Sequence, residues 1–133
     1  MSGDAGAEGQ RRILVVNDEP IIRDVVRMML GQLGHDGEFV GDGPSAVEKY
    51  REAIEAGTRF DAVIVDLSLP AGMDGVDTVK ALREIDPEVK ALVSTGYAGG
   101  EVVDQHKQYG FCGVVNKPFN LDQLTAALEK VFD

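Results

Sequence analysis

The sequence has few of the residues that build disulfides or zinc sites, and it has no long apolar run. It contains one cysteine, Cys112, and two histidines. One cysteine cannot form an internal disulfide, and together with the lack of a recognisable signal peptide it predicts a reducing, cytoplasmic setting. No apolar run approaches the length needed to cross a bilayer. The formal net charge of −10 also disfavours an anionic membrane surface, so we expect no membrane contact by this domain.

Positive charge is also scarce. The 13 lysines and arginines are outnumbered by 23 aspartates and glutamates, and the formal net charge is −10. Direct binding of nucleic acid requires a basic surface, so this balance argues against it. The hydrophobic content of 44% and the length of 133 residues instead fit one globular domain with its own core.

Apolar and amphipathic segments alternate after a small, Gly-rich start. We interpret residues 1–11 as a flexible tail or linker and residues 12–133 as one domain. Strands are predicted at Arg12–Asn17, Gly37–Gly41, Asp61–Asp66, Lys90–Thr95 and Gly113–Asn116. Helices are predicted at Pro20–Leu33, Ser45–Ala56, Val76–Ile85, Gly100–Tyr109 and Leu121–Phe132. Because the runs ILVV, AVIV and ALV are continuously apolar, the strands should be covered on both faces, which predicts an α/β fold with a parallel sheet. The second strand, GEFVG, is less apolar and suits a sheet edge.

Acidic residues follow two of the predicted strands. Asp18 and Glu19 come after the first strand, and Asp66 ends the third. The carboxyl ends of parallel strands share one edge, where open α/β sheets hold their ligands. Two neighbouring carboxylates repel each other unless a cation joins them. These loops contain no histidine or cysteine, so oxygen ligands and Mg²⁺ are favoured over zinc, with a solvated rim that holds no ion as the alternative.

Two further polar residues fall at the same predicted edge. Thr95 ends the fourth strand, and Lys117 follows the fifth. A hydroxyl, an ammonium group, carboxylates and a hard cation together suit a phosphoryl group. An aspartate can itself receive phosphate as a nucleophile, and Asp66 is the best candidate because it is central in chain order. Taken singly, Thr95 could reflect β-propensity alone and Lys117 an ordinary surface lysine.

Four segments carry a resemblance to a known family. ILVVNDEP, VIVDLSLPAGMDG, ALVSTGYAG and GFCGVVNKPFNLDQL, within roughly residues 12–132, resemble the receiver domain of two-component response regulators. The likeness is greatest to receivers of hybrid sensor histidine kinases. It implies a doubly wound, flavodoxin-like (βα)5 fold with the strand order 2-1-3-4-5. It also implies Mg²⁺ as cofactor, a histidine kinase or histidine phosphotransfer domain as partner, and a possible homodimer.

The resemblance assigns roles to individual residues. Asp66 is similar to the aspartate that takes phosphate from a phosphohistidine. Asp18 is similar to the direct magnesium ligand, and the backbone carbonyl of Ser68 to a further ligand. Thr95 resembles the hydroxyl residue that moves toward the phosphate, and Lys117 the lysine that pairs with it.

Some positions depart from the family's pattern. Asn17 takes a place that is usually acidic, so it could reach the metal only through water, and we expect weaker magnesium binding. The loop after Asp66 is one residue longer than the commoner form, at Gly72. Val114 takes the place of an aromatic switch residue in many relatives, which puts the usual coupling in doubt. Tyr97 either covers the phosphate or is a surface aromatic.

The first predicted helix carries more apolar residues than a core stripe needs. Ile21, Val25 and Met28 lie on a flank beside the stripe, near the acidic edge. They form either a docking site for the phosphohistidine partner or part of a broad buried face.

The predicted function is that of a phosphoacceptor signalling domain in a phosphorelay, not of an enzyme that turns over a metabolite. The alternative is a receiver fold that docks without phosphate, which Asn17 favours. A phosphatase with an aspartate nucleophile is disfavoured because Asp66 lacks a second acid two residues later, and a flavin protein because NDEP would repel a phosphate without a metal. The chain is either a stand-alone receiver or a piece of a hybrid kinase, and its Gly-rich start favours the second.

Overall fold

Five parallel strands form one sheet in the order β2-β1-β3-β4-β5. The computed structural model describes residues 11–70, 72–95, 105–116 and 120–132. The strands are β1 (Arg12–Val16), β2 (Asp36–Val40), β3 (Ala62–Asp66), β4 (Ala91–Thr95) and β5 (Gly113–Asn116). The predicted doubly wound α/β fold and its strand order are confirmed, and β2 is an edge strand as expected.

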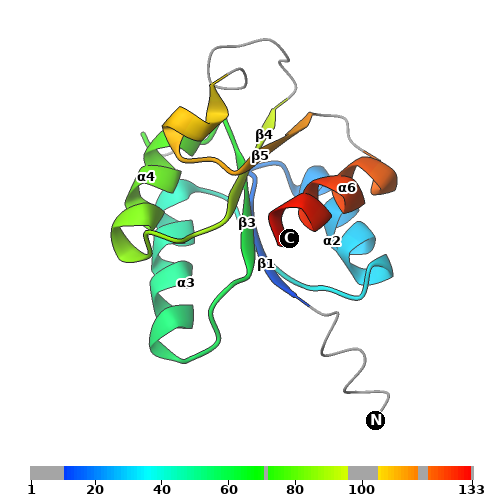
Figure 1. The fold of residues 1–133 in the computed structure, drawn as a ribbon, viewed down its shortest axis with the longest axis horizontal. Coiled ribbons are helices and arrows are strands. Elements are labelled where there is room, and N and C mark those ends of the chain that lie inside the picture. Colours follow the sequence, from blue (N-terminus) through cyan, green and yellow to red (C-terminus); the bar gives the residue numbers. More distant parts are fainter. Residues whose placement is uncertain (1–10, 71, 96–104, 117–119, 133) are drawn as a thin grey trace.

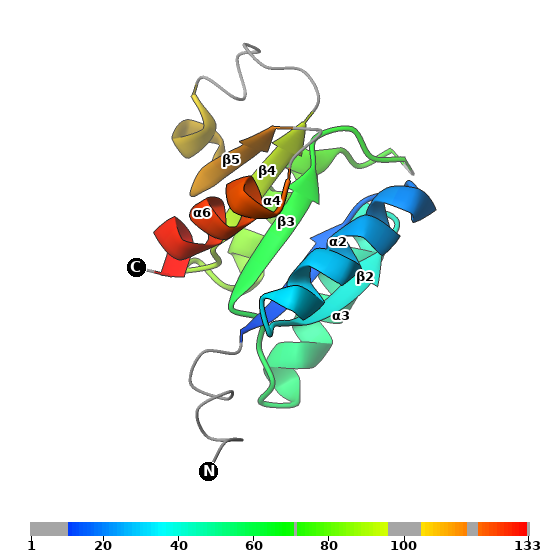
Figure 2. The same cartoon turned by 90° about the vertical axis from the view of Figure 1, so that its right-hand side faces the viewer.

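Helices cover both faces of this sheet (Figure 1). They are α2 (Pro20–Gln32), α3 (Gly43–Glu55), α4 (Gly75–Ile85) and α6 (Leu121–Phe132), with a 3-10 helix η1 (His106–Tyr109). Helices α3 and α4 pack on one face, where Tyr50, Val79 and Leu82 join the core with Val63 and Val65. Helices α2 and α6 pack on the other face (Figure 2). The two covered faces explain why the central strands are apolar throughout.

Local capping sets several helix ends. Asn120 accepts the Gln123 backbone N–H at 2.8 Å through its side chain, and the Gln123 side chain accepts the Asn120 N–H at 3.0 Å, so these two residues cap the start of α6. Gly34 follows α2 with a φ of 79°, and the His35 N–H donates to the Leu30 carbonyl at 2.9 Å. This left-handed residue ends α2, whose last residue, Gln32, lies one position before the predicted end at Leu33.

The fourth predicted helix, Gly100–Tyr109, lies partly outside the described residues, and it can be compared with the structure only from residue 105 onward. Within the described residues only the four-residue η1 is helical there, and it ends at Gly110 with a φ of 97°. A 3-10 turn is favoured over a continuing α-helix because the Gly110 and Phe111 N–H groups fold back onto Lys107 and His106 carbonyls. In the part of the chain that the structure describes, no helix is long and apolar enough to span a membrane.

Candidate functional site

Three neighbouring strands bring buried polar residues to one edge of the sheet. Asn17 directly follows β1, Asp66 ends β3 and Thr95 ends β4, and their exposed fractions are 3%, 5% and 5%. Asp18, next to Asn17, is exposed. Buried polar side chains normally have hydrogen-bond partners or a functional reason to be there. The structure therefore gathers Asn17, Asp18, Asp66 and Thr95 at the edge that the sequence predicts.

Asp66 is held on the central strand of the sheet. Its Oδ1 accepts the Ser68 backbone N–H at 3.3 Å. The Gly75 N–H donates to the Leu67 carbonyl at 3.0 Å, which closes the loop between β3 and α4. A Cβ on Gly75 would lie 2.5 Å from the Asp66 carbonyl oxygen, so only glycine lets α4 start this close to the strand. This tight loop fixes both the Asp66 carboxylate and the backbone of Ser68.

Asn17 makes two hydrogen bonds that hold the loop after β1. Its Oδ1 accepts the Glu19 N–H at 2.9 Å, and its carbonyl oxygen accepts the Arg23 Nη1 at 2.7 Å. An amide oxygen has two lone pairs, so Asn17 retains acceptor capacity for one more donor such as a water. The Arg23 contact joins α2 to the acidic edge, and sequence reasoning missed it because the contact depends on how the loop folds back.

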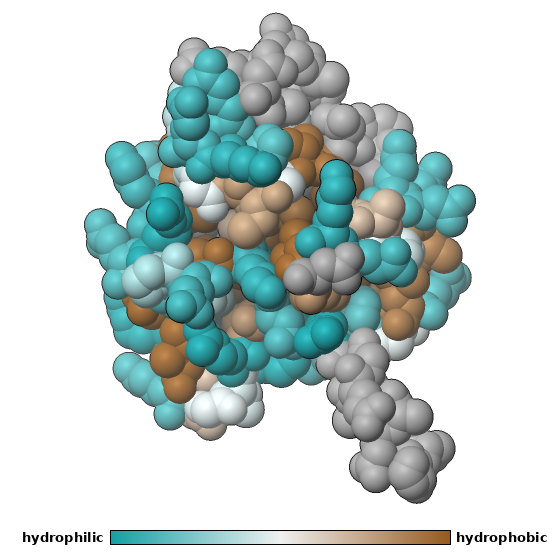
Figure 3. All heavy atoms as spheres, in the orientation of Figure 1, coloured by the Kyte–Doolittle hydropathy of each residue, from teal (hydrophilic) through white to brown (hydrophobic). Residues whose placement is uncertain are grey.

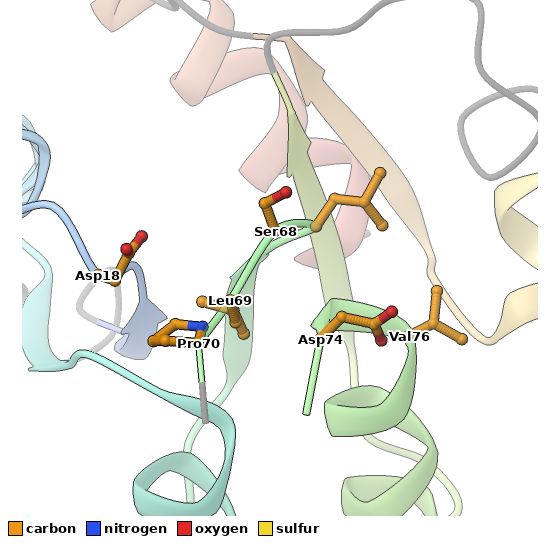
Figure 4. Close-up of a pocket in the computed structure, with 7 residues that line it drawn as sticks. Asp18, Ser68, Leu69, Pro70, Asp74 and Val76 are labelled. Carbon is orange, nitrogen blue, oxygen red and sulfur yellow. The ribbon is translucent and has the colours of Figure 1, made fainter. Parts of the chain in front are cut away.

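A groove of about 540 Å³ opens beside this edge, between the loop after β1 and the loop after β3. It is lined by Asp18, Leu67, Ser68, Leu69, Pro70, Asp74 and Val76. Figure 4 shows Asp18 and Asp74 on opposite sides of the segment that carries Ser68 and Pro70. Asp74 caps α4 by accepting the Asp77 N–H at 2.9 Å. Sequence reasoning did not select Asp74, although a D-G pair ahead of a helix is a capping signal.

The donor atoms at this edge fit a hard cation. Asp18 and Asp66 have carboxylate oxygens at the ends of neighbouring strands, and the backbone of Ser68 lies in the loop after β3. Among the described residues, no group of three or more histidine, cysteine, aspartate or glutamate side chains is arranged to hold a metal ion, so a cation at this edge would rely on two carboxylates with backbone and water oxygens. Two carboxylates supplemented by carbonyl and water oxygens are a set that Mg²⁺ accepts.

Helix α2 presents apolar side chains to solvent next to the site. Ile21, Val25 and Met28 are 76%, 40% and 68% exposed, while the core side of the helix buries Val26 and Leu30. Hydrophobic surface is visible on the side of the molecule where α2 lies (Figure 3). The broad buried face considered from the sequence is therefore wrong for these three residues, which we name the α2 patch. Apolar residues exposed together on one helix face mark a candidate interaction surface.

The remaining predicted positions are placed in part. Val114 is half-buried and packs against the core on the α3 and α4 face. Gly72 adopts a φ of 71°, in keeping with an extra turn residue in the longer loop. Lys117 and Tyr97 lie outside the described residues.

Comparison with known proteins agrees with this arrangement. The model of the response regulator receiver domain matches residues 13–129. The chemotaxis protein CheY of Thermotoga maritima is 30% identical over 123 residues, which cover 91% of this chain and 97% of that protein. Some curated relatives are much longer, and the chain spans 15% of a Chaetomium thermophilum transcription factor, SKN7, and 25% of an Escherichia coli transcriptional regulatory protein, ZraR.

Solved structures are similar over most of the chain. CheY4 of Vibrio cholerae has a TM-score of 0.82 at 31% identity, covering 92% of this chain and 98% of its own. The receiver domain of the sensor histidine kinase PA1611 from Pseudomonas aeruginosa has a TM-score of 0.81 at 27% identity, with the same coverage. That structure holds a magnesium ion coordinated in the active site cleft.

Receiver domains bind Mg²⁺ at their active site and interact with histidine kinases or phosphotransfer proteins in two-component signalling. The matched segment contains the carboxyl ends of β1, β3, β4 and β5 and thus every strand end that forms the candidate site. By its sequence, its strand order and the acidic edge of its sheet, this chain belongs to the response regulator receiver domain family.

Proposed function

We propose that Asp66 accepts a phosphoryl group from a phosphohistidine on a histidine kinase or histidine phosphotransfer domain. The observation that carries this role is a carboxylate, 5% exposed, at the end of the central strand and next to the groove that Asp18 and Ser68 line. A carboxylate oxygen of Asp66 attacks phosphorus, the bond between phosphorus and the histidine nitrogen breaks, and the imidazole leaves with that electron pair and takes up a proton. The product is an acyl phosphate on Asp66.

The chain's own groups prepare this step. The Ser68 N–H orients the Asp66 carboxylate, and the Thr95 hydroxyl and Lys117 ammonium would pair with phosphoryl oxygens. Asp18, Asp66 and the Ser68 carbonyl would hold Mg²⁺ directly, with Asn17 reaching it through a water. When bound, Mg²⁺ neutralises the charge that accumulates between the carboxylates and the phosphoryl oxygens.

The α2 patch is proposed as the docking surface for the phosphohistidine partner. Helix α2 starts at Pro20, two residues after Asp18, so a partner helix on Ile21, Val25 and Met28 would carry its histidine toward the acidic edge. Phosphorylation adds up to two negative charges near the end of β4, and a shift in a two-state equilibrium would carry the signal. Since Val114 replaces the aromatic of many relatives, backbone or loop movement would transmit it.

The proposed role as a phosphoacceptor domain also leads to proposals about activity, partners and domain context. We propose that the chain performs phosphoryl uptake and hydrolysis on itself only, that it makes no direct contact with nucleic acid, and that it can pair with a second copy. We further propose that the chain is a piece of a hybrid kinase, as the Pseudomonas aeruginosa receiver, 27% identical to it, is the receiver domain of a sensor histidine kinase.

The test is intact mass after incubation with phosphoramidate, with and without Mg²⁺, on the wild type and Asp66→Asn. We expect one magnesium-dependent phosphate adduct that disappears in Asp66→Asn. Asp74→Asn is the matched control, because it neutralises an acid of the same groove while asparagine still caps a helix well. No adduct at any magnesium concentration would refute the phosphoacceptor role and leave docking without phosphate.

A further inference from the structure

Ser94 is a third buried polar residue in line with Asn17 and Asp66. Their exposed fractions are 2% for Ser94, 3% for Asn17 and 5% for Asp66. Asp66 on β3 is paired in register with Ser94 on β4, and Ser94 is paired with Val115 on β5. Asn17 and Asp66 directly follow Val16 and Val65, which are paired as well. A polar row therefore crosses three adjacent strands at the candidate site.

The side chains of this row share one face of the sheet. Successive residues of a strand point to opposite faces, so positions two apart lie on the same side. Leu92 and Ile64 belong to the core under α2 and α6, which places Ser94 and Asp66 on that side. Thr95, the next residue on β4, projects from the opposite face, so the two hydroxyls flank the strand end from different sides.

The hydroxyl of Ser94 is buried without a hydrogen bond. Among the described residues its Oγ contacts no donor or acceptor within hydrogen-bond geometry. Leaving a buried hydroxyl unsatisfied is costly, and valine or alanine at position 94 would avoid that cost in a strand whose first three residues are ALV. The register puts this donor beside the carboxylate of Asp66 without a hydrogen bond between them in this state.

We infer that Ser94 is a positioning residue that stabilises the phosphorylated form of Asp66, an inference that rests on the proposed function. When one oxygen of Asp66 bonds to phosphorus, the other becomes the carbonyl oxygen of an acyl phosphate. Rotation about χ1 lets the Ser94 hydroxyl donate to that oxygen from the neighbouring strand. Because this hydrogen bond is absent before transfer and present after it, it favours the phosphorylated state.

The experiment compares Ser94→Ala, Ser94→Thr and the wild type by calorimetric titration with beryllofluoride in excess Mg²⁺, and by the half-life of the acyl phosphate from intact mass. For Ser94→Ala we expect beryllofluoride affinity and half-life to fall on the order of five-fold, as for one lost hydrogen bond. Its stability without ligand should equal or exceed that of the wild type. Ser94→Thr keeps the hydroxyl and should restore both values.

A matched control separates this effect from the loss of any buried hydroxyl. Thr78 is fully buried on α4, and its Oγ1 donates to the Asp74 carbonyl at 2.8 Å. Thr78→Val should lose stability without ligand and keep the wild-type beryllofluoride affinity. The inference is overturned if Ser94→Ala keeps the wild-type beryllofluoride affinity and acyl phosphate half-life. It is also overturned if Ser94→Ala lowers both values and Ser94→Thr lowers them equally. If the wild type itself takes no phosphate and binds no beryllofluoride, the proposed function fails and the inference falls with it.

Discussion

A hydrogen bond between Tyr50 and Asp86 should stabilise the layer of helices α3 and α4. The Tyr50 hydroxyl donates to Asp86 Oδ2 at 2.7 Å, and the two residues are 1% and 7% exposed. In Tyr50→Phe, Asp86 keeps its contacts to Arg59 and to the Glu88 N–H. Because a buried hydrogen bond to a charged group contributes about 1.5–3 kcal/mol, we expect unfolding free energy to fall by about 2 kcal/mol. For a domain of this size that corresponds to a Tm lower by about 8 °C.

The loss should depend on pH in a defined direction. Burial alone raises the pKa of Asp86, but hydrogen bonds from Tyr50, Arg59 and the Glu88 N–H outweigh it and hold this pKa below its usual value. A carboxyl whose pKa is depressed in the folded protein stabilises it above its unfolded pKa, and this contribution is lost as pH falls through the folded pKa. Burial, and then the bond to Asp86, raise the pKa of Tyr50 far above its usual value, so the hydroxyl remains a donor. The loss of unfolding free energy in Tyr50→Phe should thus be largest at neutral pH and become smaller below about pH 4.

Urea unfolding followed by far-ultraviolet circular dichroism at neutral and acidic pH measures this cost. Asp86→Asn and the double variant complete a mutant cycle, in which we expect a coupling energy of about 1.5 kcal/mol at neutral pH. A loss below about 0.5 kcal/mol, or a loss of equal size at both pH values, would refute the reasoning, since either result means that the charged hydrogen bond contributes little.

Three further changes test the site and its surroundings. Asn17→Asp keeps the acceptor for the Glu19 N–H and adds a charge, so the Kd for Mg²⁺ should fall on the order of ten-fold in calorimetry, and an unchanged Kd would contradict a metal beside residue 17. Met28→Glu should slow phosphotransfer from a phosphohistidine partner about ten-fold and leave labelling by phosphoramidate unchanged; equal slowing of both would exclude a docking role. Gly75→Ala should cost about 2 kcal/mol of unfolding free energy, because its Cβ meets the Asp66 carbonyl oxygen. Gly31→Ala, in α2 with open space around it, should be neutral or stabilising, and equal effects in both would refute the steric argument.

Patterns local in sequence predicted the elements well. The bounds of β5 and α6 match the prediction, and Asn120 and Gly34 act at the helix ends where their residue types are favoured. The predicted first residues of the strands agreed less well with the structure. Strand β2 begins at Asp36 because the Asp36 N–H pairs with the Arg11 carbonyl of a neighbouring segment, and such a contact leaves no local pattern.

Strand order and site geometry needed more than local pattern. Parallel strands covered on both faces look alike in sequence, so the order came from the family resemblance and not from periodicity. The acids at the strand ends were found because every strand of a parallel sheet delivers its carboxyl end to the same edge. Ser94 was passed over because a single serine in an apolar strand has meaning only once its register with Asp66 is known.

The loop after β1 joins the proposed metal site to the proposed docking surface through Asn17. Asn17 holds the Glu19 N–H with its side chain and the Arg23 guanidinium with its carbonyl oxygen, and the Arg23 N–H donates to the Glu19 carbonyl at 3.1 Å. In both hydrogen bonds the Asn17 oxygen is the acceptor. An aspartate has the same two acceptor oxygens, so the fold does not require an amide at this position. What the amide changes is charge. Asn17 therefore lowers the negative charge of the proposed metal site, and its two hydrogen bonds keep α2 and the α2 patch fixed relative to that site.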